Sequence, residues 1–381
     1  MATNRPMLPY ARQSVSDDDI EAVIDVLRSD WLTTGPKVEA FERAFADFAG
    51  VSEAVTFANG TAALHAAMVA AGVDAGDEVI VPAMTFVASA NAAIYLRARP
   101  VIADVDGATL LIDPRSVEGK ITERTKAIVA VDYAGQPCDY DALRSLAESH
   151  GLTLIGDACH ALGAEYKDKK VGAIADFTVF SFHPVKHITT GEGGMITTAD
   201  RRAAEQMRRF RSHGINANHR ERSEQETWRY DMESLGYNYR LSDFQCALGL
   251  SQLGTLPARL VRRREIARVY DSAFAAFANV KPLIVAPRVH HAYHLYVIRV
   301  RERARVFRNL RQRGIGVNVH YLPIHLHPYY RRTFSTAPGD CPVAEQAYEE
   351  ILSLPMFSGM TIDDACRVIE AVAEEVEEHA A

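Results

Sequence analysis

The sequence predicts an α/β protein whose central sheet has seven strands, most of them parallel, with a smaller α/β domain at the C-terminal end. From residue 54 onward, short apolar runs alternate with helical patterns, which is typical of a parallel sheet covered by helices on both faces. The chain has 381 residues, too many for one small core, so we expect two or three domains. We place the large domain, with its N-terminal segment, at residues 1–250 and the smaller domain at 251–381.

The first 50 residues predict two helices that precede the sheet. Ser16 is suited to cap the first helix, because Asp19 follows it three residues later. Its apolar stripe consists of Ile20, Val23, Ile24 and Leu27. The second helix covers residues 38–48 and ends at Gly50.

The seven strands and the helices between them follow in order. The expected strands are 54–57, 78–81, 100–103, 127–131, 152–155, 177–180 and 195–197. The expected helices are 61–71, 87–96, 140–149 and 201–210. Residues 215–233 are polar and long for a simple connection, so we expect a mobile or functional loop.

The C-terminal part begins with two expected helices, 244–253 and 257–277, the second leading into the smaller domain. The domain itself is expected to contain a strand, a helix, a strand and a last helix, at 294–299, 303–313, 317–321 and 363–377.

Composition and charge restrict the class of protein. Hydrophobic residues make up 48% and charged residues 24%, as in ordinary globular domains. The net charge is −7, from 42 basic and 49 acidic residues, so we expect no nucleic-acid partner. The five cysteines form no CxxC pair, and we expect reduced thiols, no metal site and a cytoplasmic protein. We find neither a signal peptide nor an uninterrupted apolar run of membrane-spanning length, so no membrane association is expected.

A lysine and a carboxylate indicate the chemistry. Lys186 lies between the apolar runs 177–182 and 195–197, and Asp157 follows the run 152–155. A lone lysine between strands usually points into water. In an open α/β sheet, however, ligands bind beyond the carboxyl ends of the strands, where both residues are expected. A lysine amine there can form a Schiff base with pyridoxal 5′-phosphate (PLP), and a carboxylate can keep the ring nitrogen protonated. We therefore predict that Lys186 and Asp157 are catalytic.

Further residues fit the same cofactor, although each has an ordinary structural alternative. Gly60 and Thr61 open a helix directly after a strand, so they suit a phosphate, or form a simple turn. Ser181 could bind phosphate or be satisfied by the backbone. Phe86 could stack on the pyridine ring or pack in the core. His160 could contact the ring hydroxyl, or it could be structural.

Several motifs together resemble one known family. They are GDEVIVP at 76–82, TFVA at 85–88, DACH at 157–160, SFHPVK at 181–186, GEGG at 191–194, GYNYRL at 236–241 and VHY at 319–321. In this combination the chain is similar to the PLP-dependent nucleotide-sugar aminotransferases of the DegT/DnrJ/EryC1/StrS family, from about Leu8 to Val372.

The resemblance implies PLP-dependent transferase fold type I and a homodimer with shared active sites. It implies that Lys186 binds the cofactor covalently and Asp157 pairs with the ring nitrogen. It places Gly60, Thr61 and Ser181 at the phosphate, and Phe86 on the ring. It also places Asn238 at the phosphate of the partner subunit. The segments that match the sugar-nucleotide site contain Thr33, Gly35, His320 and Tyr321.

Four segments narrow the resemblance, namely VDYAG at 131–135, HALGAEY at 160–166, FRSHG at 210–214 and ALGLSQL at 247–253. They are most similar to the C4 aminotransferases of pseudaminic acid biosynthesis. That subgroup implies L-glutamate as amino donor and the C4 ketone of a UDP-linked 4-keto-6-deoxy-2-acetamido sugar as acceptor.

The alternatives are a C4 or C3 aminotransferase for another nucleotide-linked keto sugar, of the GDP-perosamine or dTDP-amino sugar type, and a PLP-binding sensor without turnover. A related sugar dehydratase would carry histidine in place of Lys186.

Overall fold

A seven-stranded sheet forms the centre of the protein, a computed structural model that describes residues 6–217, 220, 222 and 226–377. The strand order is β1-β9-β8-β5-β4-β2-β3, and only β9 runs against its neighbours. The strands are β1 (Glu53–Phe57), β2 (Glu78–Pro82), β3 (Arg99–Ala103), β4 (Thr125–Val131), β5 (Thr153–Asp157), β8 (Phe177–Ser181) and β9 (Gly194–Thr198). All seven expected strands are present, and the predicted fold class is confirmed.

The sheet is apolar on both faces because helices cover it. The helices of the large domain are α2 (Pro36–Ala49), α3 (Gly60–Ala70), α4 (Ala88–Tyr95), α5 (Pro114–Glu118), α6 (Tyr140–His150) and α7 (Arg201–Phe210). Every residue of β2 is buried, as expected for a strand covered on both sides. On β8, the side chains of Phe177 and Val179 belong to the hydrophobic cluster that includes α3, whereas Phe180 packs with Phe41 and Phe45 of α2.

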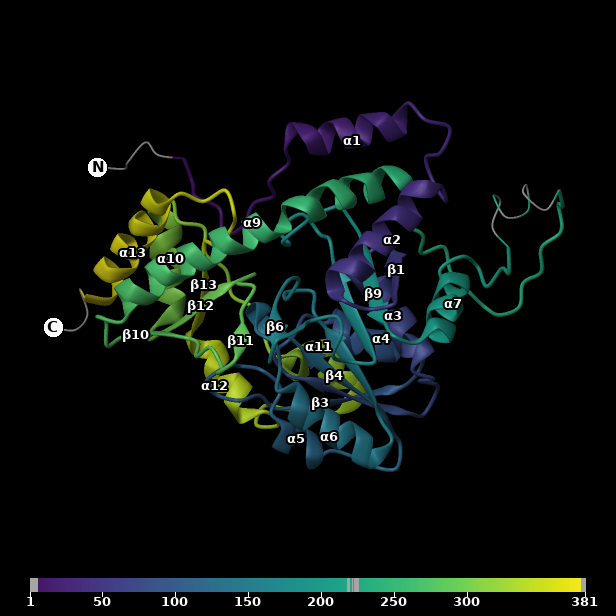
Figure 1. Ribbon diagram of the computed structural model, residues 1–381. Helices are drawn as coiled ribbons and strands as arrows, with labels where there is room; N and C mark the ends of the chain where they lie inside the picture. The colour runs from purple at the N-terminus through teal and green to yellow at the C-terminus, as the bar shows by residue number, and fades with distance from the viewer. Residues whose placement is uncertain (1–5, 218–219, 221, 223–225, 378–381) are drawn as a thin grey trace.

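A long helix connects this sheet with a smaller C-terminal assembly (Figure 1). This helix, α9 (Asp243–Phe274), is followed by a three-stranded antiparallel sheet of β10 (Val280–Pro282), β12 (Tyr296–Val300) and β13 (Ile351–Leu354). Helices α10 (Arg303–Gln312) and α13 (Ile362–Glu377) pack against each other beside it. Leu8 belongs to the same hydrophobic cluster, and its backbone nitrogen lies 2.9 Å from the carbonyl oxygen of Gly314. Both ends of the chain therefore lie at this end of the molecule (Figure 1).

Several short elements complete the fold. They are β6 (Glu165–Tyr166), β7 (Lys169–Lys170), β11 (Val289–His290), α11 (Pro328–Phe334) and α12 (Pro342–Glu350), with 3₁₀ turns at Tyr133–Gly135 and Ile324–Leu326.

Two expectations for the C-terminal half are wrong. The two helices expected at 244–253 and 257–277 are one 32-residue helix, with Pro257 inside it. An internal proline costs a helix about 3 kcal/mol, but Leu253, Leu256 and Leu260 are buried on either side of it, and this packing holds the helix together. The boundary predicted at residue 250 lies within α9 and stays a prediction.

The strand expected at 317–321 is also not formed. Asn318 exchanges backbone hydrogen bonds with Ser353, but Tyr321 has already left the small sheet, and its backbone nitrogen contacts Met84 of the large domain. The third strand of the small sheet is β13 instead.

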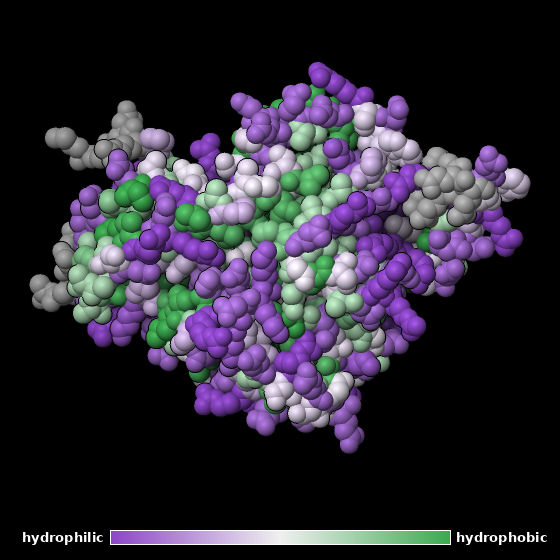
Figure 2. Space-filling view, viewed as in Figure 1, coloured by the Kyte–Doolittle hydropathy of each residue, from purple (hydrophilic) through white to green (hydrophobic). Residues whose placement is uncertain are grey.

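The first helix, α1 (Asp17–Leu27), has the expected capping box at Ser16. Its buried residues are Asp19 and Val26. Asp19 accepts hydrogen bonds from Ser251 at 2.6 Å and Gln252 at 2.8 Å on α9. The apolar stripe of this helix is therefore partly exposed: Ile20 and Leu27 are about half exposed, at 49% and 57%. Figure 2 shows hydrophobic residues on this face of the molecule around α9 and α2, below α1.

Candidate active site

A cleft of about 910 Å³ lies at the carboxyl ends of the central strands. The residues predicted for the site reach it from different elements. Asp157 ends β5, Lys186 lies in the turn after β8, and Phe86 follows β2. The site residues predicted from the sequence that line the cleft are Gly60, Thr61, Phe86, Asp157, His160, Ser181, Lys186, His320 and Tyr321. The fold thus brings together residues that are up to 261 positions apart in the chain, from Gly60 to Tyr321.

Lys186 lies in the turn between β8 and β9. This turn requires glycine at Gly194, because another segment of backbone lies close to it. A Cβ atom on Gly194 would lie 2.5 Å from the carbonyl oxygen of Asn59. Burial lowers the pKa of the Lys186 amine, although the charges of Cys159 and Asp157 act in the opposite direction. A larger fraction of this amine is therefore neutral and nucleophilic than of an exposed lysine.

Asp157 is buried behind the lysine. Its Oδ2 accepts a hydrogen bond from the Ser89 hydroxyl at 2.7 Å, and its Oδ1 accepts one from the backbone nitrogen of Cys159 at 3.2 Å. Two donors therefore hold the orientation of the carboxylate.

The N-terminus of α3 forms a cradle suited to a phosphate. The Asn59 side chain caps the helix by accepting a hydrogen bond from the backbone nitrogen of Ala62 at 2.8 Å. A Cβ atom on Gly60 would lie 3.2 Å from Cβ of Ser181 and 3.4 Å from Sγ of Cys159, so a larger residue would narrow the cradle. Backbone N–H groups at a helix N-terminus and the hydroxyls of Thr61 and Ser181 are suitable donors for a phosphate, and the residues present fit PLP.

Aromatic and imidazole rings form the opposite wall. His160 is buried, and its Nε2 lies 3.1 Å from the Tyr321 hydroxyl, while its Nδ1 has no partner. Burial and the nearby Lys186 hold the pKa of His160 well below its usual value, so the ring is neutral. Phe86 is 57% exposed, with its ring centroid 6.1 Å from that of Tyr321. A large exposed aromatic side chain at a cleft is available to stack on a flat ring.

Three predicted residues do not line this cleft. Gly35 donates its backbone N–H to Asp243 at 2.7 Å, Thr33 pairs with Ser242, and Asn238 pairs with Ser212 and is exposed. Their roles at the cofactor or the substrate stay predictions.

Several lining residues were not predicted from the sequence. The ring of His294 lies tilted against that of His160, with 4.3 Å between ring centroids, and Tyr10 comes from the N-terminal segment. Both arrive through tertiary packing, for which the sequence carries no local signal. Thr85 also lines the cleft, just before α4 begins.

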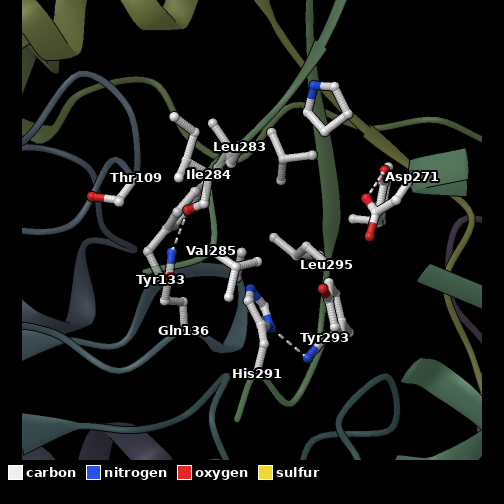
Figure 3. Close-up of a pocket in the computed structure, with 14 residues that line it drawn as sticks. Thr109, Tyr133, Gln136, Asp271, Leu283, Ile284, Val285, His291, Tyr293 and Leu295 are labelled. Carbon is white, nitrogen blue, oxygen red and sulfur yellow. Dashed lines mark hydrogen bonds between the residues drawn. The ribbon is translucent and has the colours of Figure 1, made fainter. Parts of the chain in front are cut away.

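A second cavity, between Gln136, His291 and Tyr293, is much smaller (Figure 3). Its volume is about 20 Å³, which is enough for one water molecule. Hydrogen bonds from Gln136 to the carbonyl of Ile284 and from the backbone of Tyr293 to His291 close it off. It has no room for a substrate.

Two other kinds of site are absent from the residues that the structure describes. Among the described residues, no three His, Cys, Asp or Glu side chains are grouped as metal ligands. None of the helices in the described part of the chain has the length and apolar character needed to cross a bilayer.

Several known proteins are similar to this chain in sequence and in fold. Residues 13–373 match the DegT/DnrJ/EryC1/StrS aminotransferase family. The spore coat polysaccharide biosynthesis protein SpsC of Bacillus subtilis is 42% identical over 379 residues, or 96% of each chain.

Solved structures agree with this match. The aminotransferase PseC of Helicobacter pylori, involved in pseudoaminic acid biosynthesis, is 34% identical with a TM-score of 0.92, over 98% of this chain and 100% of that one. A putative sugar aminotransferase of Streptococcus pneumoniae, Spr1654 in its PLP form, is 32% identical with a TM-score of 0.90, over 97% and 99% of the two chains. The chain therefore belongs to the DegT/DnrJ/EryC1/StrS family and is a PLP-dependent sugar aminotransferase.

Proposed function

We propose that the enzyme transfers the amino group of L-glutamate to the C4 ketone of a UDP-linked 4-keto-6-deoxy-2-acetamido sugar, as in pseudaminic acid biosynthesis. The observation that carries this proposal is the similarity to PseC over nearly the whole chain. The four segments that resemble the same subgroup support it. The cleft volume of about 910 Å³ is also at the upper end of the range for small-molecule sites, which suits a cofactor together with a sugar.

The side chains of the cleft have distinct roles in this proposal. Bound PLP supplies a carbonyl group that takes up the amino group and a ring that withdraws electrons. Lys186 holds the cofactor covalently between reactions and then, as a free amine, accepts and returns a proton at Nζ. Asp157 would stabilise the positive charge of the ring nitrogen. Thr61, Ser181 and the N-terminus of α3 would hold the phosphate, and Phe86 and His160 would hold the ring.

A panel of nucleotide sugars tests the substrate. UDP-, GDP- and dTDP-linked 4-keto sugars are each incubated with the PLP-loaded enzyme and glutamate, and the products are identified by NMR. We expect turnover of the UDP-linked 2-acetamido sugar with the new amine at C4. A new amine at C3, or a clear preference for a GDP- or dTDP-linked sugar, would contradict the proposal and favour one of the related sugar aminotransferases.

We also propose that two subunits share each active site. Several large hydrophobic side chains of the single chain are exposed between α7 and α9, including Trp228 at 90% and Leu235 at 76%. The described residues 226–235 of this segment project away from the central sheet (Figure 1). The outward stripe on α1 adds further apolar surface. Exposed apolar surface of this extent is typical of protein–protein interfaces, and Asn238, at the end of the same segment, does not line its own cleft.

Subunit mixing tests the shared site. Lys186→Ala and Asn238→Ala homodimers are each expected to have impaired activity. If Asn238 acts in the partner's site, a mixed dimer has one site with both changes and one with neither. Such dimers, purified with two different tags, are then expected to recover up to about half of the wild-type activity. Verified mixed dimers that stay as impaired as the parents would show that Asn238 serves its own subunit.

A further inference from the structure

Two buried hydroxyl groups lie in a row behind Asp157. The Ser89 hydroxyl is 2.7 Å from Oδ2 of Asp157, and the Thr85 hydroxyl is 2.7 Å from the Ser89 hydroxyl. Ser89 is fully buried and Thr85 is 2% exposed. Hydrogen bonds in such a dry environment are stronger than those exposed to water.

The chemistry of the groups fixes the direction of both bonds. An ionised carboxylate only accepts hydrogen bonds, so Ser89 donates to Asp157. The only proton of the Ser89 hydroxyl is then used, and Ser89 must accept its second bond from Thr85. Thr85 therefore donates to Ser89, and Ser89 donates to the carboxylate of Asp157.

The start of α4 makes this arrangement possible. Thr85 lies after β2 and lines the cleft, and Ser89 lies on the first turn of α4. Neither hydroxyl is used to cap the helix, since no side-chain cap is formed there. The hydroxyls of Thr85 and Ser89 are therefore free to hydrogen-bond toward Asp157.

We propose that Thr85 and Ser89 are positioning residues that act through Asp157 on the cofactor ring. Hydrogen bonds donated to a carboxylate favour its charged form, and bonds to charged groups are about twice as strong as neutral ones. The two hydroxyls thus hold the Asp157 carboxylate in a fixed orientation, so that it can stabilise a protonated ring nitrogen. This inference rests on the proposed role of Asp157.

Binding of two cofactors to the apoprotein tests the inference without any turnover. One is PLP, and the other is 1-deaza-PLP, in which carbon replaces the ring nitrogen. The variants are Ser89→Ala and Thr85→Val, the latter nearly identical in shape to threonine. Thr85→Ser keeps the hydroxyl, and Thr178→Val is a matched control, because the buried Thr178 hydroxyl has no partner.

We expect Ser89→Ala to weaken PLP binding about tenfold or more, the size of a lost bond to a charged group, and Thr85→Val to weaken it about threefold. Binding of 1-deaza-PLP should change less than about twofold, and both control variants should bind PLP as the wild type does. In an Asp157→Asn background, Ser89→Ala should have no further effect, because the two residues act as one unit.

Equal weakening for both cofactors would show a merely structural role and overturn the inference, as would unchanged PLP binding in both variants. If Ser89→Ala does not fold, the binding of PLP and 1-deaza-PLP is compared for Thr85→Val and Thr85→Ser alone. Weaker binding of PLP only, and only in Thr85→Val, then supports the inference. The outcome does not depend on the sugar substrate. An enzyme that rejected every nucleotide sugar would refute the proposed function but leave the ratio of the two cofactor affinities unchanged.

Discussion

Replacement of Lys186 by alanine is expected to abolish turnover, with a loss of about 10³-fold or more. Positioned acid–base groups alone contribute about 10²–10⁴-fold, and the same amine also holds the cofactor. Turnover with glutamate and the sugar acceptor is measured by 2-oxoglutarate release. Borohydride reduction should fix the cofactor on Lys186 in the wild type, as peptide mass mapping detects, and on no residue in the variant.

Two control variants make the test specific. Lys186→Arg keeps a positive charge but cannot form the covalent bond, so it should be as inactive as the alanine variant. Lys169→Ala removes an exposed lysine and should retain full activity. Partial recovery of Lys186→Ala by added ethylamine would identify the missing proton carrier. Multiple turnovers by Lys186→Ala at the wild-type rate would assign the chemistry to another group.

Mild acid is expected to destabilise the protein strongly. Burial lowers the pKa of six histidines in the described residues, and these are His65, His160, His187, His291, His294 and His320. Below pH 6.5 the unfolded chain binds protons at these positions that the folded protein does not bind. The free energy of unfolding therefore falls as the pH decreases, by roughly 1 kcal/mol per histidine and pH unit.

Two carboxyl groups in the described residues act in the opposite direction. Burial raises the pKa of Asp132 to about 7 and also raises the pKa of Asp271, so the folded protein holds protons there that the unfolded chain has lost. Six histidines outweigh two carboxyl groups, and the net stability still decreases between pH 7 and pH 5.

Urea unfolding of the apoprotein between pH 5 and pH 7.5 measures this dependence. His187→Asn should reduce the slope by about one proton, because His187 is buried with only one ring nitrogen bonded, to the carbonyl of Ala292. His150→Asn, which removes an exposed histidine, is the control variant. A free energy of unfolding that stays constant or rises as the pH falls below 6.5 would contradict the expectation.

The sequence was a good guide wherever a signal is local. The apolar runs of the seven strands and the capping box at Ser16 depend on neighbouring residues, and all are present. Lys186 and Asp157 could be placed in one cleft from the sequence, because each follows a predicted strand and the strand ends meet at one edge of a sheet.

The features that the sequence did not predict have a common physical cause, which is packing between segments that are distant in the chain. The residues near Pro257 do not indicate that the helix continues past the proline, since this depends on the burial of leucines on both sides of it. An amphipathic helix usually buries its apolar face, but the apolar stripe of α1 is partly exposed. Here Asp19 turns inward to reach two partners more than 230 residues away. His294 in the cleft depends on a similar long-range contact.

The place of Leu8 in the C-terminal hydrophobic cluster has a consequence for synthesis on the ribosome. The central sheet has all its strands once Thr198 has been made, but the C-terminal cluster combines Leu8 with residues as late as Val376. Leu8 therefore gains its last packing partners only after Val376 has been made. The cleft lacks His320 and Tyr321 until synthesis has passed residue 321, so this wall of the cleft is completed well after Lys186 and Asp157 have been made.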